Sequence, residues 1–503
     1  MHSEAPVPDD ASESIRLRNV HPAGWVNPQP KARYHLVVVG GGTAGLVTAA
    51  IAAGLGAKTA LVERHWMGGD CLNVGCVPSK ALIRSGRSWN AATTAQARFG
   101  GPAVAGQGDF ASVMKRMRGI RADMSAVDSA DRFRSLGVDV FFGQASFRSE
   151  DRASVGGQDL EFRRAVIATG SRPAVPPIPG LADARYLTNE TVFTLTECPR
   201  RLVVIGAGAI GSELAQTFAR FGSKVTLLER EDRILTMDDP DAARVVALAI
   251  ERDGVTVLTG VTIDRVVGSA PAVVHFTRNG VAETAYADAI LVAGGRAPNV
   301  DGLGLDAAGV EYDDRKVMTD NRLRTSNRRI YAAGDITGRA PFTHAADAQA
   351  RMVIRNALFF GRAKVENLVV PWCTYTQPEV AHVGMSWESM KNGSVPTESL
   401  TIPLRDVDRA RLDGSEDGFL RVHLRKGSDR IVAATLVADR AGDTIAQLSM
   451  AMTRRLGLGA IGETIFPYPT ESEAIRKAAD AWRRKKLTPR AAGLFRTWFK
   501  YVR

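Results

Sequence analysis

One glycine pattern constrains the fold of this chain more than any other feature of its sequence. Residues 36–39 are apolar and predict a buried parallel strand, which leads into Gly40-x-Gly42-x-x-Gly45 and an alanine-rich helix. A second predicted strand over 59–62 ends in Glu63, 23 residues after the first glycine. Such glycines permit a tight turn and let backbone N–H groups approach a pyrophosphate at a helix N-terminus, while the acid accepts hydrogen bonds from a ribose. The pattern therefore predicts a dinucleotide-binding βαβ unit.

The same pattern occurs again downstream. A predicted strand over 202–205 leads into Gly206-x-Gly208-x-x-Gly211, and Glu229 follows the next strand, again 23 residues after the first glycine. Two glycine-rich packing turns would be the alternative, but they leave the shared distance to an acid unexplained. Two nucleotide sites indicate a flavin and a nicotinamide cofactor. Glu229 favours NADH because a carboxylate repels the 2′-phosphate of NADPH, although the adjacent Arg230 could instead bind that phosphate.

Composition sets the class of chain. A length of 503 residues predicts about three domains, and 45% hydrophobic residues exclude a mostly disordered chain. Four cysteines exclude a disulfide-stapled scaffold, and the N-terminus has neither the basic start nor the apolar core of a secretory signal, so we expect a cytoplasmic protein. Residues 36–57 carry no charge and are long enough for a membrane span, but their six glycines favour the strand–turn–helix interpretation.

Two of the four cysteines, Cys71 and Cys76, lie five positions apart directly after the first βαβ unit. Two thiols near the start of a helix can form a reversible disulfide, since the helix terminus favours the thiolate. A pair of buried structural cysteines is the alternative. No metal site is expected, because no second cysteine pair or histidine cluster accompanies them. Cys198 and Cys373 are interpreted as ordinary core thiols.

The segment 68–80, Gly-Gly-Asp-Cys-Leu-Asn-Val-Gly-Cys-Val-Pro-Ser-Lys, resembles the active-site signature of the FAD-dependent (class I) pyridine nucleotide-disulfide oxidoreductases. This family includes dihydrolipoyl dehydrogenase, glutathione reductase and mercuric reductase. The segments 168–173, 295–299, 332–335 and 377–384 also resemble family motifs, so the resemblance extends from about Tyr34 to Asp480. It implies an α/β fold with two Rossmann-like dinucleotide-binding domains, for FAD and NAD(P), and a C-terminal α+β dimerisation domain.

The motifs together predict a domain order in which the nicotinamide domain interrupts the flavin domain. The expected divisions are a polar N-terminal tail (1–30), the first part of the FAD-binding domain (31–197), the NAD(P)-binding domain (198–317), the second part of the FAD-binding or central domain (318–365), the dimerisation domain (366–480) and a basic amphipathic C-terminal tail (481–503).

The resemblance also implies roles for particular residues. Cys76 would lie against the flavin as the charge-transfer thiolate, and Cys71 would be the interchange thiol that meets the substrate. Lys80 would lie near the reactive edge of the flavin, paired with Glu213. Residues implied to bind FAD are Gly40, Gly42, Gly45, Glu63, Lys80, Ala145, Thr169, Gly170, Asp335 and Thr343, and those implied to bind NAD(P)H are Gly206, Gly208, Gly211, Glu229 and Gly295. Electrons would then pass from nicotinamide through FAD to a Cys71–Cys76 disulfide.

The chain departs from the family pattern near its C-terminus. Most disulfide reductases of the family have a His-Pro-x-x-x-Glu motif whose His is the general acid and base; here Tyr468 occupies the His position, and Glu473 is kept. A phenol with a pKa near 10 is a poor proton shuttle at neutral pH. Tyr468 is either a packing replacement or a sign that the substrate needs no such proton. A Tyr here resembles mercuric reductase-like members, although the chain lacks their C-terminal cysteine pair.

We therefore predict transfer of electrons to a small-molecule disulfide or a thiol-bound metal ion. A dihydrolipoyl dehydrogenase activity is the alternative, and a low-turnover, membrane-associated redox sensor is an alternative of another class. The resemblance implies a homodimer, because the loop carrying Tyr468 reaches the partner's cysteines in this family.

The net charge of +11 first suggests nucleic acid, but no nucleic-acid-binding motif is present. Part of the charge lies after Asp480, where a basic run at 483–486 precedes apolar residues spaced for one helical face at 494, 495, 498, 499 and 502. Residues 483–503 are a candidate for peripheral membrane contact, and packing on the chain's own body or the dimer partner is the alternative.

Overall fold

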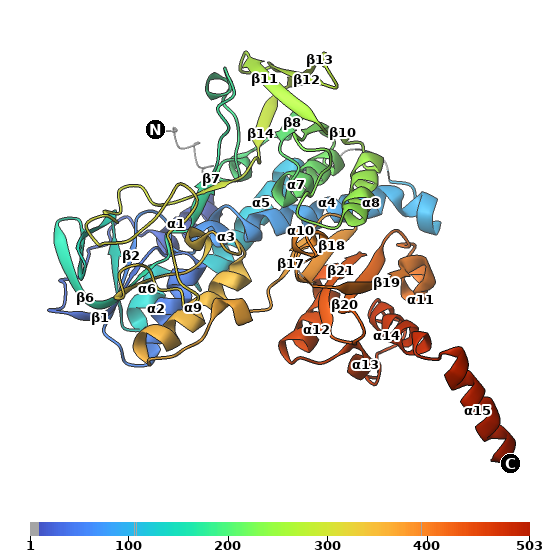
Figure 1. Cartoon of the computed structure of the whole chain (residues 1–503). Helices are drawn as coiled ribbons and strands as arrows, with labels where there is room; N and C mark the ends of the chain where they lie inside the picture. The colour runs from blue at the N-terminus through green and yellow to red at the C-terminus, as the bar shows by residue number, and fades with distance from the viewer. Residues whose placement is uncertain (1–9, 105, 107, 394, 503) are drawn as a thin grey trace. The chain divides into compact units, whose positions relative to one another are not determined.

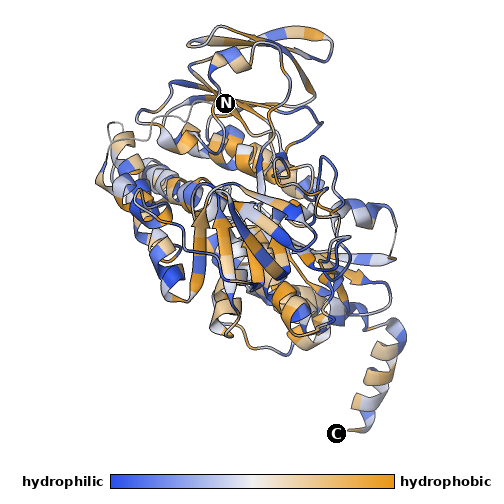
Figure 2. Cartoon of the chain, turned by 90° about the vertical axis from the view of Figure 1, so that its left-hand side faces the viewer, coloured by the Kyte–Doolittle hydropathy of each residue, from blue (hydrophilic) through white to orange (hydrophobic). Residues whose placement is uncertain are grey.

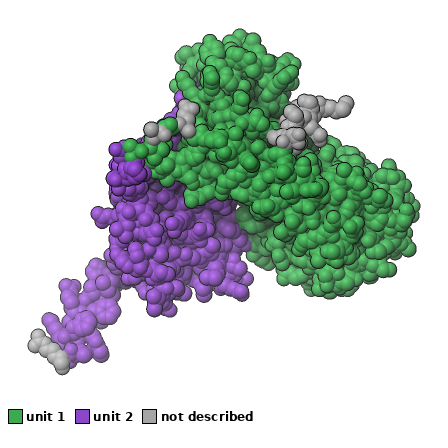
Figure 3. Space-filling view, turned by 180° about the vertical axis from the view of Figure 1, so that it is seen from behind, with its two compact units in different colours: residues 1–93, 103–228, 261–368 green, residues 94–102, 229–260, 369–503 purple. Residues whose placement is uncertain are grey.

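The computed structural model describes residues 10–104, 106, 108–393 and 395–502. Two compact units divide the chain, one comprising residues 1–93, 103–228 and 261–368 and the other residues 94–102, 229–260 and 369–503 (Figure 3). We call them unit 1 and unit 2. Of the sequence-based predictions, the N-terminal tail at 1–9 and Arg503 lie outside the described residues.

The first glycine pattern folds as predicted, with β1 (Tyr34–Val39), α2 (Thr43–Gly54) and β2 (Thr59–Glu63) in the expected order. β1 pairs in parallel with β2, and Leu36 aligns with Thr59. Alternate β1 side chains face opposite sides of the sheet, so that Leu36 joins one buried core cluster and Val37 joins another. A strand buried on both faces in this way explains why the run is continuously apolar.

Further strands extend this sheet on both sides of β1, in parallel pairs near β1 and in antiparallel pairs at one edge. The strand order is β3-β2-β1-β6-β5-β4, and β16 pairs with β6. The added strands are β3 (Val138–Phe142), β4 (Ala145–Ser149), β5 (Arg152–Val155), β6 (Gln158–Ile167) and β16 (Ile330–Ala332). α2 packs beside α9 (Thr343–Leu358) on one face of the sheet (Figure 1). The chain therefore returns to the first sheet more than a hundred residues after leaving it.

The second glycine pattern forms a further parallel arrangement in unit 1. β8 (Arg201–Ile205), α7 (Ala209–Arg220) and β9 (Lys224–Leu228) follow one another, and β14 (Ala289–Val292) pairs with β8. β11 (Val261–Val267), β12 (Ala272–Arg278) and β13 (Val281–Ala287) form a separate antiparallel sheet. β7 (Ser171–Pro173) pairs with β15 (Arg296–Pro298).

Helices occupy the segment between β2 and β3. They are α3 (Gly69–Asn73), α4 (Cys76–Phe99), α5 (Phe110–Ser125) and α6 (Ala130–Ser135). Within unit 1, Trp89 of α4 and Phe110 of α5 pack edge-on against Phe221 at the end of α7. These aromatic contacts join the helix that begins at Cys76 to the second glycine pattern.

Residues 10–30 differ from the expected polar tail. Residues 11–20 form α1 (Ala11–Val20), and Glu13 and Arg16 on this helix are only 2% exposed. Asp10 caps the helix by accepting a hydrogen bond from the backbone N–H of Glu13 (2.9 Å). The polar composition of the segment therefore reflects buried ion pairs, whose partners are described below.

Unit 2 contains an antiparallel sheet in the order β17-β18-β21-β20-β19. Its strands are β17 (Pro371–Thr374), β18 (Glu379–Gly384), β19 (Thr397–Pro403), β20 (Phe419–Arg425) and β21 (Ile431–Ala438). The helices of the unit are α8 (Pro240–Arg252), α10 (Trp387–Lys391), α11 (Asp408–Leu412), α12 (Ala441–Thr453), α13 (Leu458–Ile461), α14 (Glu473–Lys485) and α15 (Pro489–Tyr501). One buried apolar cluster joins the sheet to α12 and α14.

Within the described residues, no helix combines the length and the apolar character that crossing a membrane requires. Residues 36–57, whose length alone would permit a span, form β1, α2 and the turns beside them.

Candidate functional site

The first glycine turn brings backbone close to backbone at the end of β1. Gly40 has a φ of +108°, and a Cβ at this position would clash with the carbonyl group of Ala168. A Cβ at Gly45 would clash with the carbonyl oxygen of Gly40. α2 begins at Thr43 with Gly42 as its N-cap, and no side chain caps the helix. The backbone N–H groups at this helix start are therefore placed to receive a phosphate.

Glu63 ends β2 beside that turn. Its carboxylate accepts hydrogen bonds from the backbone N–H groups of Gly41 (2.6 Å) and His65 (2.7 Å). A hollow next to it is lined by Val39, Gly40, Val62, Glu63, Arg64, Gly143, Gln144, Ala145, Thr169, Asn299, Asp301 and Leu303. Four of the residues expected to bind FAD, Gly40, Glu63, Ala145 and Thr169, thus share one hollow. The turn has glycines at positions where a Cβ would clash, a helix start without a side-chain cap and a carboxylate held by two hydrogen bonds. Together these features fit one end of a dinucleotide.

A polar network places Asp335, which begins a short 3₁₀ helix, near the end of β6. The hydroxyl of Ser171 donates to the Asp335 carboxylate (2.7 Å), and Gly170 beside it has a φ of +67°. Arg296 ion-pairs with Asp335 (3.7 Å) and also with Asp70, the residue before Cys71. Burial raises the pKa of the Asp70 carboxyl. Sequence reasoning did not single out Asp70 or Arg296, because their pairing joins segments 226 residues apart.

The two cysteines lie at adjacent helix ends and contact one another. Cys71 belongs to α3, and Cys76 is the first residue of α4. A hydrogen bond from the Cys71 thiol lowers the pKa of Cys76 to about 6, with Thr343 and Lys80 acting in the same direction. That hydrogen bond raises the pKa of Cys71, and burial adds to the increase. The hydroxyl of Thr343 lies 3.4 Å from the Cys76 sulfur. The contact therefore favours the thiolate form of Cys76 over that of Cys71.

Lys80 and Glu213 form the ion pair that the resemblance implies. Lys80 lies one turn after Cys76 on α4, and its Nζ is 2.8 Å from an Oε of Glu213 on α7. Glu213 is 4% exposed. An ammonium group held in this way provides a fixed positive charge near the Cys76 thiolate.

Buried charges behind the cysteines also contact their segment, and sequence reasoning missed them. Asn73, between the two cysteines, accepts a hydrogen bond on its side chain from Arg16 (2.7 Å) and on its backbone carbonyl from Arg121 (2.7 Å). Both arginines ion-pair with Glu13 of α1. The signal that could have revealed α1 is Asp10-x-x-Glu13, the spacing of a helix N-terminal capping motif.

The second glycine turn repeats the geometry of the first. Gly206 has a φ of +98°, and a Cβ there would lie 2.7 Å from the carbonyl oxygen of Ala293. A Cβ at Gly211 would clash with the carbonyl of Gly206, and Gly208 is the N-cap of α7 without a side-chain cap. Gly295 has a φ of +147°. Three of the four glycines predicted to bind NAD(P)H, Gly206, Gly211 and Gly295, therefore lie where backbone conformation or close approach favours glycine, whereas Gly208 has a negative φ and no neighbour within 4 Å of a Cβ.

Glu229 follows β9 directly, as the pattern requires. Its carboxylate accepts a hydrogen bond from the backbone N–H of Glu231 (3.0 Å). Arg230, which the sequence left as a possible phosphate ligand, ion-pairs with the Glu231 carboxylate (2.8 Å).

Tyr468 and Glu473 belong to unit 2. The Tyr468 side chain is exposed, and its hydroxyl donates a hydrogen bond to the Asp408 carboxylate (3.0 Å), which raises the pKa of the phenol. Glu473 accepts from the backbone N–H of Asp408 (3.2 Å) and ion-pairs with Lys477 (3.1 Å). A phenol with a raised pKa is a weaker acid than free tyrosine, so this geometry does not supply a proton shuttle at neutral pH.

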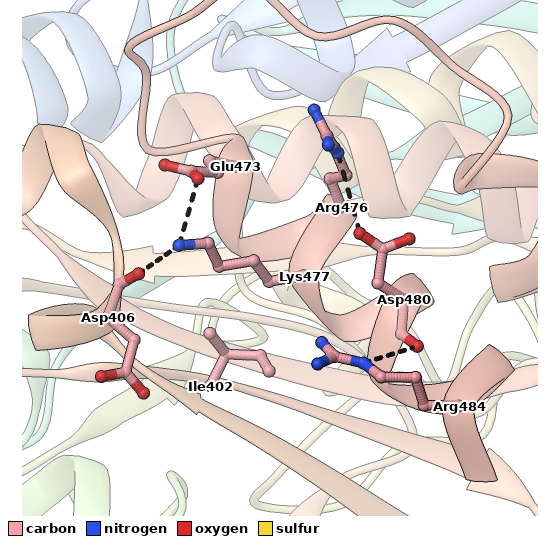
Figure 4. Close-up of a pocket in the computed structure, with 7 residues that line it drawn as sticks. All are labelled: Ile402, Asp406, Glu473, Arg476, Lys477, Asp480 and Arg484. Carbon is pink, nitrogen blue, oxygen red and sulfur yellow. Dashed lines mark hydrogen bonds and ion pairs between the residues drawn. The ribbon is translucent and has the colours of Figure 1, made fainter.

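A charged pocket adjoins Glu473 on the surface of α14 (Figure 4). It is lined by Ile402, Asp406, Glu473, Arg476, Lys477, Asp480 and Arg484. Glu473 pairs with Lys477, and Asp480 pairs with Arg476. The three acidic and three basic side chains of the lining balance one another, so the pocket carries no net charge.

Comparison with known proteins places this geometry in context. Residues 34–350 match the family model described as pyridine nucleotide-disulphide oxidoreductase, and residues 370–479 match the dimerisation domain of that family. Mercuric reductase from Staphylococcus aureus is 34% identical over 448 residues, which cover 89% of this chain and 82% of that protein. Dihydrolipoyl dehydrogenase from Chlamydia muridarum is 33% identical over 460 residues, covering 89% and 96%. The solved Cu(II) complex of the HOCl-induced flavoprotein disulfide reductase RclA from Escherichia coli has a TM-score of 0.78 at 27% identity, covering 88% of this chain and 98% of that one.

Proposed function

We propose, from the premise that this chain belongs to the pyridine nucleotide-disulphide oxidoreductase family, that it transfers electrons from NADH through the Cys71–Cys76 pair to a thiol-bound metal ion. The family implies FAD and a pyridine nucleotide as cofactors. Bound FAD would supply the redox chemistry that links the nicotinamide to the cysteine pair. The observation that carries the proposal is the contact between the side chains of Cys71 and Cys76 beside the Lys80–Glu213 ion pair, a contact that lowers the pKa of Cys76.

The asymmetry between the two thiols supports a different role for each. The low pKa of Cys76 keeps its sulfur anionic at neutral pH, where Lys80 stabilises it. Cys71 retains its proton in that state and becomes the thiol that meets an incoming substrate. The first glycine turn and Glu63 would bind and orient FAD, and the second turn with Glu229 would bind the nicotinamide nucleotide.

Tyr468 supports a metal-ion substrate. Reduction of a disulfide releases a thiolate that a general acid must protonate, and a phenol bound to Asp408 is a poor acid. When a soft metal ion held by thiolates accepts electrons, its metal–sulfur bonds break and its ligands return as thiolates, so no S–S bond is cleaved and the electron transfer itself requires no proton. The relatives named mercuric reductase and the solved Cu(II) complex of a flavoprotein disulfide reductase point to the same substrate class.

A second candidate is dihydrolipoyl dehydrogenase activity, which the relative from Chlamydia muridarum favours. A turnover assay with NADH or NADPH as donor, and with mercuric ion, copper ion, lipoamide or glutathione disulfide as acceptor, would distinguish the two activities. We expect turnover with a metal ion and little with lipoamide, and efficient lipoamide turnover would reverse this ranking.

Cys71→Ser tests the thiol mechanism directly. We expect it to abolish turnover with metal ions while leaving the FAD content unchanged, because the glycine turn and Glu63 do not depend on this sulfur. Cys198→Ser is the matched control, since the Cys198 side chain forms hydrogen bonds with Ser223 and with the backbone carbonyl of Phe221 and not with the Cys71–Cys76 pair. Turnover that survives in Cys71→Ser would contradict the mechanism.

Glu229 supports NADH as the donor, because Arg230 already pairs with Glu231 and a carboxylate repels a 2′-phosphate. We expect a higher kcat/KM with NADH than with NADPH, and a smaller difference in Glu229→Ala.

The dimerisation domain suggests a homodimer, and we propose that the loop carrying Tyr468 of one protomer reaches the cysteines of its partner. We also propose the boundaries of the FAD, NAD(P) and dimerisation domains given above, with limited proteolysis as their test.

A further inference from the structure

α15 carries an apolar face that the rest of its unit leaves uncovered. None of its residues is buried, and Leu494, Phe495, Trp498 and Phe499 are 73%, 53%, 61% and 67% exposed. Spacings of three and four residues place these side chains on one side of the helix, with Val502 one turn further on. Figure 2 shows the helix extending from the C-terminal end of the chain. A helix of this length is only marginally stable in water by itself, so its face needs an occupant.

The opposite side of α15 is basic. Arg496 and Lys500 lie on that side, and Arg490 flanks the apolar face near the first turn. Among the described residues, none of these three has a carboxylate partner. Residues 481–503 contain eight Lys and Arg and no Asp or Glu. This short segment therefore holds most of the chain's net charge of +11.

The apolar face of α15 could be covered by a second copy of this chain or by a lipid surface, and charge distinguishes these two occupants. A second copy of this chain carries the same net charge of +11, and its own tail repels another tail. An anionic lipid surface attracts the basic side and accepts the apolar side below its headgroups. Trp498 and Tyr501 are residue types enriched at that depth, because their rings are apolar and their edges are polar.

We propose that α15 binds the surface of an anionic lipid membrane, lying in the interface with Leu494, Phe495, Trp498 and Phe499 toward the acyl chains. The helix is too short to span a bilayer, so it attaches the protein to one leaflet. The basic run at 483–486 ends α14 just before this helix, and Lys486 lies over the Trp482 ring (3.6 Å). The attachment is independent of the redox activity proposed above, because α15 contains none of the site residues.

Vesicle flotation of the full-length FAD-loaded protein tests this attachment. We expect the protein to float with vesicles of phosphatidylglycerol and phosphatidylcholine, not with phosphatidylcholine alone, and to be released by high salt. Arg496→Glu with Lys500→Glu should weaken binding by at least about tenfold, since each basic residue near such a surface contributes a factor of about five. Arg454→Glu, at an exposed position outside α15, is the matched control.

Trp498→Ser with Phe499→Ser should also weaken binding, and Phe360→Ser, which removes another exposed aromatic side chain, should not. Equal flotation with both vesicle types, or none with either, would overturn the proposal. Loss of the dimer by light scattering when residues after Thr488 are removed, without any vesicle binding by the intact chain, would assign the face to a second copy instead.

A different observation carries a second inference, about the opposite end of the chain. Glu13 of α1 ion-pairs with Arg16 and Arg121, which are 2% and 4% exposed. Both arginines bind Asn73, whose amide also donates to the backbone carbonyls of Met67 (3.0 Å) and Gly69 (2.9 Å). The loop that carries the cysteines is thus fixed from behind through one residue. Because Glu13 lies between the two arginines, it also neutralises their mutual repulsion.

We infer that Glu13 and Arg16 are positioning residues, which hold Cys71 and Cys76 at the separation where their disulfide closes. This inference rests on the proposed redox role of the pair, but its test needs no turnover. A looser loop lowers the effective concentration of one thiol at the other and makes the disulfide easier to reduce.

The test is the thiol–disulfide equilibrium of the Cys71–Cys76 pair in the holoenzyme, measured by maleimide trapping across a series of dithiothreitol ratios. We expect Glu13→Gln and Arg16→Gln to lower the equilibrium constant for disulfide formation by about tenfold. This factor corresponds to the free-energy change that a typical single substitution causes. Asn19→Ala is the matched control, because Asn19 joins α1 to Ser125 (2.8 Å) without touching Asn73. If Glu13→Gln does not fold, Arg16→Gln provides the same test. An unchanged equilibrium in a folded variant would overturn the inference, whereas a pair that never forms a disulfide in the wild type would overturn the proposed function.

Discussion

The helices at the two ends of the chain, α1 and α15, lie outside the segments that match the family, and they differ in which kinds of side chain they bury. α1 is rich in charged residues and yet buries Glu13 and Arg16, while α15 is rich in aromatic residues and yet buries none of its side chains. Composition alone would have assigned the two positions the other way round. The difference teaches that burial follows available partners. α1 meets Arg121 and Asn73 of unit 1, which satisfy its charges, whereas none of the side chains of α15 is buried by the described residues of its own unit.

The largest expected effect breaks the buried side of this comparison. Glu13→Ala leaves two buried arginines without their counter-charge, and we expect the free energy of unfolding to fall by about 3–5 kcal/mol. Urea denaturation followed by intrinsic fluorescence measures it. Arg496→Ala on α15 should change the same free energy by less than about 0.5 kcal/mol, because its guanidinium is exposed. Similar values for the two variants would mean that the two helices do not differ in this way.

A pH profile sharpens the link between α1 and the cysteines. The folded pKa of Cys76 is lowered to about 6, so its thiolate is present above that pH and is lost as the pH falls through it. The rate at which iodoacetamide alkylates the reduced pair should then fall about tenfold for each pH unit below 6. Glu13→Gln should move the midpoint of this profile upward, because a displaced loop weakens the Cys71–Cys76 hydrogen bond, and Lys500→Glu should leave it in place. A profile midpoint near 9 in the wild type would contradict the assigned thiolate.

Matched N-caps give a smaller effect. Asp10 caps α1 and also ion-pairs with Arg118, and Thr488 caps α15 through its hydroxyl. Asp10→Ala should lower the free energy of unfolding by about 1 kcal/mol. Thr488→Ala should loosen only α15, which amide hydrogen exchange would detect without a change in the global transition. A global destabilisation by Thr488→Ala would show that α15 packs on the protein after all.

The smallest expected effect concerns the exposed aromatic residues. Trp498→Ser should leave the free energy of unfolding within about 0.5 kcal/mol of the wild-type value, since its ring packs against no buried cluster. Phe110→Ser, at a buried ring that packs on Phe221, should cost about 3 kcal/mol or more in the same assay. The pair calibrates how far an exposed aromatic side chain differs from a packed one.

Much of the fold and of the candidate site could be predicted because it depends on local backbone geometry. Gly40 and Gly206 have positive φ values, and Gly45 and Gly211 admit no Cβ, so the glycine spacing alone locates both turns. The strands before and after each turn also appear where the apolar runs place them. Cys71 and Cys76 are close in sequence, and their contact follows from the short segment between them.

Other features could not be predicted, because they depend on partners far away in the sequence. Asp239 and Asp241 ion-pair with Arg421, and this contact groups residues 229–260 with the C-terminal sheet in unit 2. No spacing rule links positions that are 180 residues apart. The same limit applies to Arg296 with Asp70.

The sequence by itself determined the two nucleotide turns, the acids that follow them and the position of the cysteine pair, because glycine geometry and short spacings act within a few turns of chain. Only the tertiary structure decided which charges are buried and which apolar face stays open. A charge enters the interior only where an opposite charge and hydrogen-bond partners already wait for it, as they do for Arg16 at Glu13 and Asn73. The described residues of unit 2 bury none of the side chains of α15, and the aromatic residues of that helix therefore remain exposed.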